Sequence, residues 1–151
     1  MLCAGSFTKK PFAEISKQEF DDAIRTNLWG SFTVAQEASK QMTGRGSGTI
    51  IVTGATASLR GSSGFSLVSM PKAAMRSMAQ SMARELGPHG IHVAHVIVDG
   101  IIWGPRTADW GIPKEKTMEP DAVAEEYVHL AQQRKSAWTH ELDLRPHDEK
   151  W

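Results

Sequence analysis

Apolar residues recur every three or four positions between residues 17 and 42, which predicts one long amphipathic helix. Ser16 followed by Glu19 is the pattern of a capping box, so the helix is expected to begin at about residue 17. Gly44 and Gly46 then close it. The positions that carry the pattern are Phe20, Ala23, Ile24, Leu28, Phe32, Val34, Ala35, Ala38 and Met42.

Two other runs, residues 50–52 and 91–98, are short and continuously apolar, as strands covered on both faces would be. A second helix is predicted between them, from Pro71 to Leu86, with Gly87-Pro88 as its stop signal. This helix carries a methionine stripe, interpreted as core or as a subunit interface: Met75, Met78 and Met82.

Beyond the second strand the pattern becomes irregular. Residues 101–118 contain two Gly, two Pro and two Trp without a regular period, which predicts a loop or lid. A helix is expected from Pro120 to about Arg134, then a last strand at 141–144 and a polar tail at 145–151. Strands that alternate with helices predict an α/β fold with a parallel sheet and right-handed crossovers, in a single domain over residues 1–151.

Composition limits the partners of this chain. With 151 residues, 40% of them hydrophobic, the chain suits one globular domain with a core. Lys+Arg and Asp+Glu balance at 17 each, so no net field attracts nucleic acid or an anionic membrane. Cys3 is the single cysteine, which excludes an internal disulfide and fits a reducing compartment. No apolar stretch approaches the ~20 residues of a membrane span, and we expect a cytoplasmic protein.

The chemistry concentrates in two stretches, GTIIVTGATASLRGSSGFSLVSMPK at 48–72 and ELGPHGIHVAHVIVDG at 85–100. Their order resembles the strand, active-site loop, helix and following strand of the short-chain dehydrogenase/reductase family. The resemblance covers the later part of the family domain. It implies a Rossmann-like fold that lacks the first βαβαβ half, and an NAD- or NADP-dependent oxidoreductase acting on a carbonyl or alcohol.

In that family a tyrosine exchanges a proton with the substrate, and a serine steadies the substrate oxygen. The resemblance places Lys72 on the lysine that assists the tyrosine and Asn27, in NLWG, on the asparagine of a water relay. It places Val68 on the tyrosine and Ala55 on the serine, and neither side chain can perform that chemistry. We therefore expect an inactive chain, unless one of four serines near the vacant position supplies a hydroxyl: Ser58, Ser62, Ser63 or Ser66.

The cofactor side also departs from the family. Asp99-Gly100 stands where the family has Pro-Gly, whose backbone meets the nicotinamide. The resemblance implies cofactor contacts at Lys72, Asp99, Gly100 and Ile102. The glycine cluster at 44–48 follows a helix and precedes a strand, so it is not the turn that holds a pyrophosphate. The chain can therefore bind NAD, NADP or neither.

Several of these residues have a simpler interpretation. Asn27 can be a structural hydrogen-bonding group, and Lys72 a solvated lysine. Pro71 costs ~3 kcal/mol if the helix already begins near Leu67, and is tolerated if it begins near Met70. Four residues of the C-terminal segment match no standard metal spacing, so we predict no metal site and a solvated strand end: His140, Glu141, Asp143 and His147.

Three functions stay open. The first is an oxidoreductase by descent that lacks the proton-transfer groups. The second is a non-catalytic module that forms a homo-oligomer through helices 17–42 and 70–86. The third is a divergent enzyme that uses Lys72 with a relocated acid.

Overall fold

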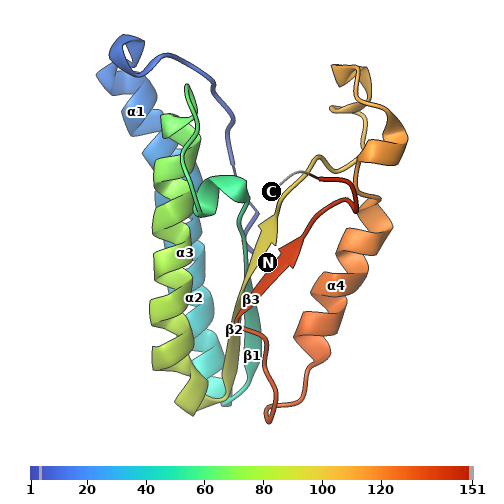
Figure 1. Cartoon of the computed structure of the whole chain (residues 1–151). Coiled ribbons are helices and arrows are strands. Elements are labelled where there is room, and N and C mark those ends of the chain that lie inside the picture. Colours follow the sequence, from blue (N-terminus) through green and yellow to red (C-terminus); the bar gives the residue numbers. More distant parts are fainter. Residues whose placement is uncertain (4, 150–151) are drawn as a thin grey trace.

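Three parallel strands form one open sheet in the computed structural model, which describes residues 1–3 and 5–149 (Figure 1). The strands are β1 (Gly48–Thr53), β2 (Ile91–Val98) and β3 (Glu141–Leu144), side by side in that order. Helices lie on both faces of this sheet. The predicted α/β fold with a parallel sheet is confirmed.

The chain start adds a short piece to the free edge of β1. Leu2 forms a parallel bridge with Val52, and its backbone N–H and C=O bond to Ile51 and Thr53. Cys3, beyond it, is exposed and free. Ala4 lies outside the described residues.

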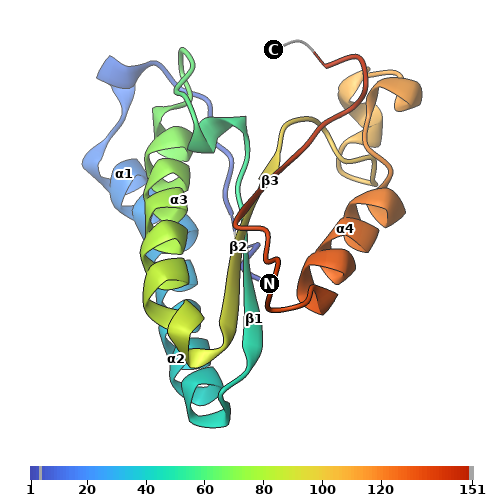
Figure 2. The same cartoon turned by 60° about the horizontal axis from the view of Figure 1, so that its bottom comes forward.

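Each face of the sheet carries its own hydrophobic cluster, because alternate residues of a strand point to opposite faces. Helices α2 (Gly30–Arg45) and α3 (Ser66–Leu86) cover one face, and α4 (Pro120–Gln132) covers the other (Figure 2). The first cluster includes Ile50, Val52, Met75, Ala79, Ile91 and Val93. The second includes Ile51, Ala94, Val96 and Leu130.

The long first helix has an interruption that the sequence pattern did not indicate. It runs as α1 (Lys17–Ile24), a π-helical segment η2 (Arg25–Trp29) and then α2. The predicted capping box is present: the backbone N–H of Ser16 donates to Glu19, and the backbone N–H of Glu19 donates to the Ser16 hydroxyl. At the other end Gly46 adopts a left-handed conformation with φ of 68°, which favours glycine.

The predicted start of the second helix at Pro71 is wrong. Helix α3 begins at Ser66, so Pro71 lies inside it and is buried. The first turn is held by the Phe65 carbonyl, which accepts from the N–H groups of Val68 and Ser69. Burial of Leu67 and the rest of the apolar face offsets the cost of an interior proline.

Residues 101–118 form an irregular connection between β2 and α4, closed by a bridge between Ile102 and Met118. Helix α4 ends at Gln132, two residues before the predicted end at Arg134, and Gln133 is already extended. Among the described residues no helix is long and apolar enough to cross a membrane. Short 3-10 helices lie at Phe12–Glu14, Thr56–Ser58, Gly87–His89, Ala108–Trp110 and Lys114–Lys116.

Candidate functional site

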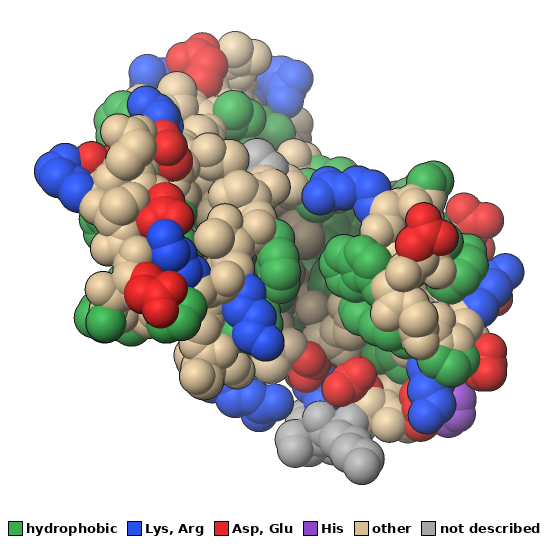
Figure 3. Space-filling model, turned by 90° about the horizontal axis from the view of Figure 1, so that it is seen from above, with side chains coloured by type: hydrophobic (Ala, Val, Ile, Leu, Met, Phe, Trp, Pro, Cys, Tyr) green, Lys and Arg blue, Asp and Glu red, His purple; other side chains and the backbone are tan. Residues whose placement is uncertain are grey.

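A hollow opens at the edge of the sheet where the strands end. Figure 3 views the molecule from above and shows it between the side of α1 and α3 and the side of residues 101–118, with hydrophobic side chains facing it. The carboxyl ends of parallel strands commonly form the binding crevice of an open α/β sheet. The loop that follows β1 forms one wall of this candidate site.

Ala55 and Val68 line one cavity of about 340 Å³ in this hollow. Ala55 comes from the loop after β1, and Val68 from the first turn of α3. The structure therefore brings together the two positions that the resemblance assigns to the serine and the tyrosine. The cavity is mainly apolar, and its other walls are Phe7, Thr56, Ala57, Arg60, Ser62, Phe65, Val98 and Gly100.

Lys72 lies one helical turn after Val68, on the same side of α3. Its ammonium donates to the Thr53 carbonyl over 2.7 Å, at the end of β1. Burial lowers the pKa of Lys72, and the neighbouring Cys3 raises it in part. Lys72 is thus a half-buried lysine anchored to the strand that leads into the site, and the interpretation as a solvated lysine is wrong.

Asn27 is 2% exposed and lies in the π-helical segment. Its side-chain oxygen accepts from the Ser6 backbone N–H over 2.5 Å, and its amide nitrogen donates to the Ser6 hydroxyl over 3.2 Å. The side chain therefore ties the first loop to the helix, as the structural interpretation predicts. Single π-helical turns occur often at functional sites, and a relay role for Asn27 stays a prediction.

Asp99 is held in the wall of the hollow by two partners. Its carboxylate accepts from the Thr56 hydroxyl, and its Oδ2 atom lies 3.2 Å from the Nη2 atom of Arg145. The same guanidinium bonds Asp143 on β3. Only 9% of the Asp99 side chain is exposed, and its carboxylate at the site is already paired with Arg145.

The other two predicted cofactor contacts lie next to Asp99. Gly100 lines both the 340 Å³ cavity and a neighbouring one of about 520 Å³, which Asp99 lines too. Ile102 is 37% exposed, and its carbonyl accepts from the Thr107 hydroxyl. Asp99 and Gly100 are therefore brought to the site that contains Ala55 and Val68, whereas Ile102 lines neither of these two cavities.

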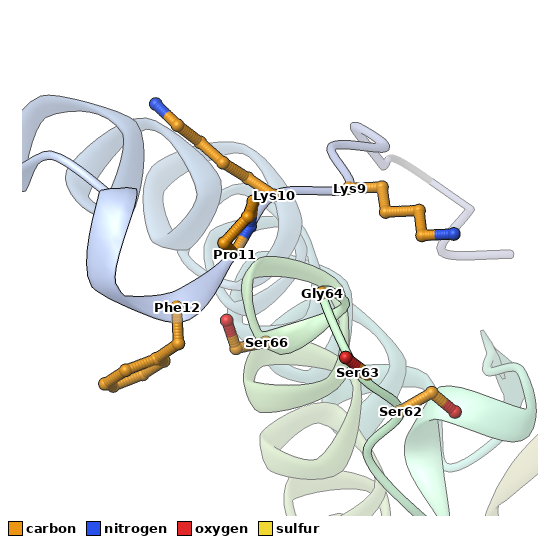
Figure 4. Close-up of a pocket in the computed structure, with 8 residues that line it drawn as sticks. All are labelled: Lys9, Lys10, Pro11, Phe12, Ser62, Ser63, Gly64 and Ser66. Carbon is orange, nitrogen blue, oxygen red and sulfur yellow. The ribbon is translucent and has the colours of Figure 1, made fainter.

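The four serines near the vacant position separate in space. Ser62 lines the 340 Å³ cavity, and Ser58 is buried within the loop after β1. Ser63 and Ser66 line a separate cavity of about 690 Å³ between the loop at Lys9 and the start of α3, which Ser62 lines as well (Figure 4). In that view the lysine ammonium groups point away from these serines. Ser62 is thus the one of the four that lines the cavity shared by Ala55 and Val68.

The predicted solvated end at β3 is wrong for Glu141. Arg76 of α3 donates to both of its carboxylate oxygens, over 2.7 and 2.8 Å, and His95 of β2 lies 2.9 Å from one of them. These bonds, with Arg76 first, lower the pKa of Glu141 to about 2. Within residues 1–3 and 5–149, no group of three or more His, Cys, Asp or Glu is placed to hold a metal ion.

One further side chain near the site was not predicted from the sequence. Tyr127, the single tyrosine of the chain, places its hydroxyl 3.0 Å from the Thr53 hydroxyl. Thr53 therefore meets Lys72 through its carbonyl and Tyr127 through its side chain. Burial raises the pKa of Tyr127. The sequence carries no signal for this contact, because the two residues are 74 positions apart.

Comparisons with known proteins agree with the resemblance to the short-chain dehydrogenase/reductase family. The profile of the family described as "short chain dehydrogenase" matches residues 1–108. The L-xylulose reductase of Mesocricetus auratus is 32% identical over 115 residues, which is 76% of this chain and 47% of that protein. A crystal structure of a short-chain dehydrogenase from Rhodopseudomonas palustris shares 40% identity, with a TM-score of 0.81 over 96% of this chain and 60% of that one.

An uncharacterized oxidoreductase of Staphylococcus aureus (strain USA300) is 26% identical over 95% of this chain and 62% of its own length. The chain thus spans between 47% and 62% of the length of these curated relatives.

Proposed function

The chain belongs to the short-chain dehydrogenase family, and we propose that it carries the lysine and the substrate cavity of a nicotinamide-dependent oxidoreductase without the family's proton transfer. One observation carries this proposal: Ala55 and Val68 line the same cavity. An alanine and a valine there can neither donate a proton nor hydrogen-bond a substrate oxygen. The cavity is therefore suited to bind a small carbonyl or alcohol ligand and not to turn it over.

Lys72 supports the cofactor part of the proposal. An ammonium has three hydrogens, and the bond to the Thr53 carbonyl uses one of them. The others can reach a ribose hydroxyl above the strand end, and the backbone at Gly100 would face the nicotinamide. A bound NAD or NADP would supply hydride transfer. The sequence has no glycine-rich turn for the pyrophosphate, so we expect weak binding.

A thermal-shift titration with NADH and NADPH tests the cofactor part. A ligand that binds the native state raises its melting temperature through mass action. We expect saturable stabilisation of the wild type and its loss in Lys72→Met. Lys40→Met on the exposed side of α2 is the matched control. A flat response of the folded wild type to both cofactors would overturn this part.

Restoration of the two missing groups tests the proton-transfer part. L-Xylulose is the first probe, because a relative carries the name L-xylulose reductase. We expect no cofactor oxidation by the wild type and measurable oxidation by the double variant Ala55→Ser, Val68→Tyr. Wild-type turnover abolished by Lys72→Met would instead support the reading with a relocated acid, for which Tyr127 is then the residue to test.

A second candidate function, that of an interaction module, rests on exposed aromatic side chains. Trp29 is 62% exposed and stacks on Phe32, with ring centroids 5.6 Å apart. Phe32 also lines a groove of about 230 Å³ between α2 and α3, with Met78 and Met82. Self-association through the predicted helices would cover these groups.

Light scattering on the purified chain tests this candidate. We expect a dimer for the wild type and a monomer for the double variant Trp29→Ser, Phe32→Ser. Val128→Ser on α4 is the control, since Val128 is equally apolar and 54% exposed on the opposite face of the sheet. A wild-type monomer at high concentration would exclude the homo-oligomer.

A further inference from the structure

A buried histidine lies beneath the loop that carries Ala55. His95 of β2 is 0% exposed, and its Nδ1 lies 2.9 Å from a Glu141 oxygen. Arg76 holds the same carboxylate through two hydrogen bonds. A carboxylate so bonded only accepts, so Nδ1 carries the hydrogen. In the neutral ring Nε2 is then an acceptor.

That acceptor faces the loop. Among the described residues, Nε2 of His95 is a buried atom without a hydrogen-bond partner. Gly54 leaves the space in front of it: a Cβ on this glycine would overlap Nε2 and lie 2.7 Å from the Ser58 hydroxyl oxygen. The imidazole and the Ser58 hydroxyl thus converge on the same point beside the Gly54 backbone.

Ser58 has a hydrogen to offer. Ser58 is 4% exposed, and its hydroxyl oxygen accepts from the Ala55 backbone N–H over 3.1 Å. This contact uses a lone pair of the hydroxyl and leaves its hydrogen free to be donated. A buried acceptor and a buried donor at one place are strongly favoured to pair, directly or through one water.

We propose that His95 is a positioning residue of the candidate site. Its neutral imidazole, oriented by Glu141, accepts from the Ser58 hydroxyl directly or through one water, and so fixes the loop of residues 54–58. Ala55 and Thr56 of that loop line the cavity, whereas His95 does not, so the placement of the cavity wall depends on a ring outside the cavity. This inference goes beyond the proposed function, because it holds for the free protein.

The charge state of the ring decides the contact. The charged or titratable groups that face it are Glu141 on β3, Arg76 on α3 and His140 just before β3. Burial is the first cause that lowers the pKa of His95, which keeps the ring neutral near pH 7. Protonation would place a hydrogen on Nε2 and remove the acceptor that Ser58 needs.

Nitrogen NMR of the full chain, labelled with 15N in all residues, tests the proposal. We expect His95 with hydrogen on Nδ1 and a free Nε2 that accepts a hydrogen bond. His95→Leu should shift the amide resonances of residues 54–58. His95→Gln should restore them, because its amide donates to Glu141 and its oxygen accepts from Ser58. His89→Leu, on an exposed histidine, should leave them in place.

Ser58→Ala keeps the test decisive if His95→Leu does not fold. Removal of the hydroxyl should shift the Nε2 resonance of His95 in an otherwise native protein. A hydrogen on Nε2 at pH 7, or an Nε2 resonance unmoved in Ser58→Ala, would overturn the proposal. These readouts need no ligand, so they stay interpretable if no cofactor or substrate binds.

Discussion

Replacement of Glu141 by Gln should reveal the ion pair that joins β3 to α3. The variant keeps the shape of the side chain and an oxygen that can accept from His95, so it removes mainly the charge. In the wild type that charge meets Arg76 through two bonds of 2.7 and 2.8 Å. The expected result is a loss of folding stability at neutral pH.

The magnitude follows from the carboxyl group. The pKa of Glu141 is about 2 in the folded protein, against an ordinary value of 4.5. Each pH unit of such a shift corresponds to about 1.4 kcal/mol, which gives an upper value of about 3 kcal/mol. The side chain is 28% exposed, and solvent screening reduces the contribution. We expect Glu141→Gln to lower the free energy of unfolding by about 2 kcal/mol at pH 7.

The pH dependence separates this cause from a packing defect. A lowered carboxyl pKa contributes stability above pH 4.5 that disappears as the pH falls toward 2. Urea unfolding of both proteins should thus show the full difference at pH 7 and a smaller one at pH 3. Glu125→Gln, on the exposed face of α4, is the control with no expected change. An equal difference at both pH values would refute the reasoning.

Three further predictions concern the strand ends around the site. Gly54→Ala should lower the free energy of unfolding by about 1–3 kcal/mol, because the new Cβ would overlap His95; unchanged urea unfolding would contradict this. Tyr127→Phe should cost about 1 kcal/mol through the lost bond to Thr53, and a thermal midpoint equal to that of the wild type would argue against it. The pKa of His95 is lowered from 6.5 by burial. As the pH falls, the unfolded chain therefore binds more protons than the folded chain. Unfolding free energy should therefore decrease below about pH 6.5, and less so in His95→Gln.

The sequence pattern predicted the elements well where neighbouring residues decide the conformation. The start at Ser16 depends on a capping box that closes within four residues, and β2 matches its predicted range. The predicted start of α3 is wrong because it treats Pro71 as a local start signal. In the folded chain the proline sits inside a helix whose buried face stabilises it.

The geometry of the predicted site depends in a similar way on short spacings. The spacing of Ala55, Val68 and Lys72 depends on one loop and one helix, and the structure brings these residues to the same strand end. The electrostatic partners of the site could not be predicted, because they are distant in the sequence. Asp99 meets Thr56 from 43 positions away, and no local pattern marks such a contact.

The sequence by itself determined the order of strands and helices and the family resemblance, which assigns Ala55 and Val68 to the serine and tyrosine positions. These features follow from residue types and short spacings, which can be recognised without knowledge of the packing. Only the tertiary structure decided which charges are paired and buried. Arg76, Glu141 and His95 come from a helix and two strands, and they meet because the parallel register of β2 and β3 sets His95 opposite Glu141 while α3 packs on the same face. Such a meeting depends on the register of the strands and the packing of the helix, which residue spacing along the chain does not encode.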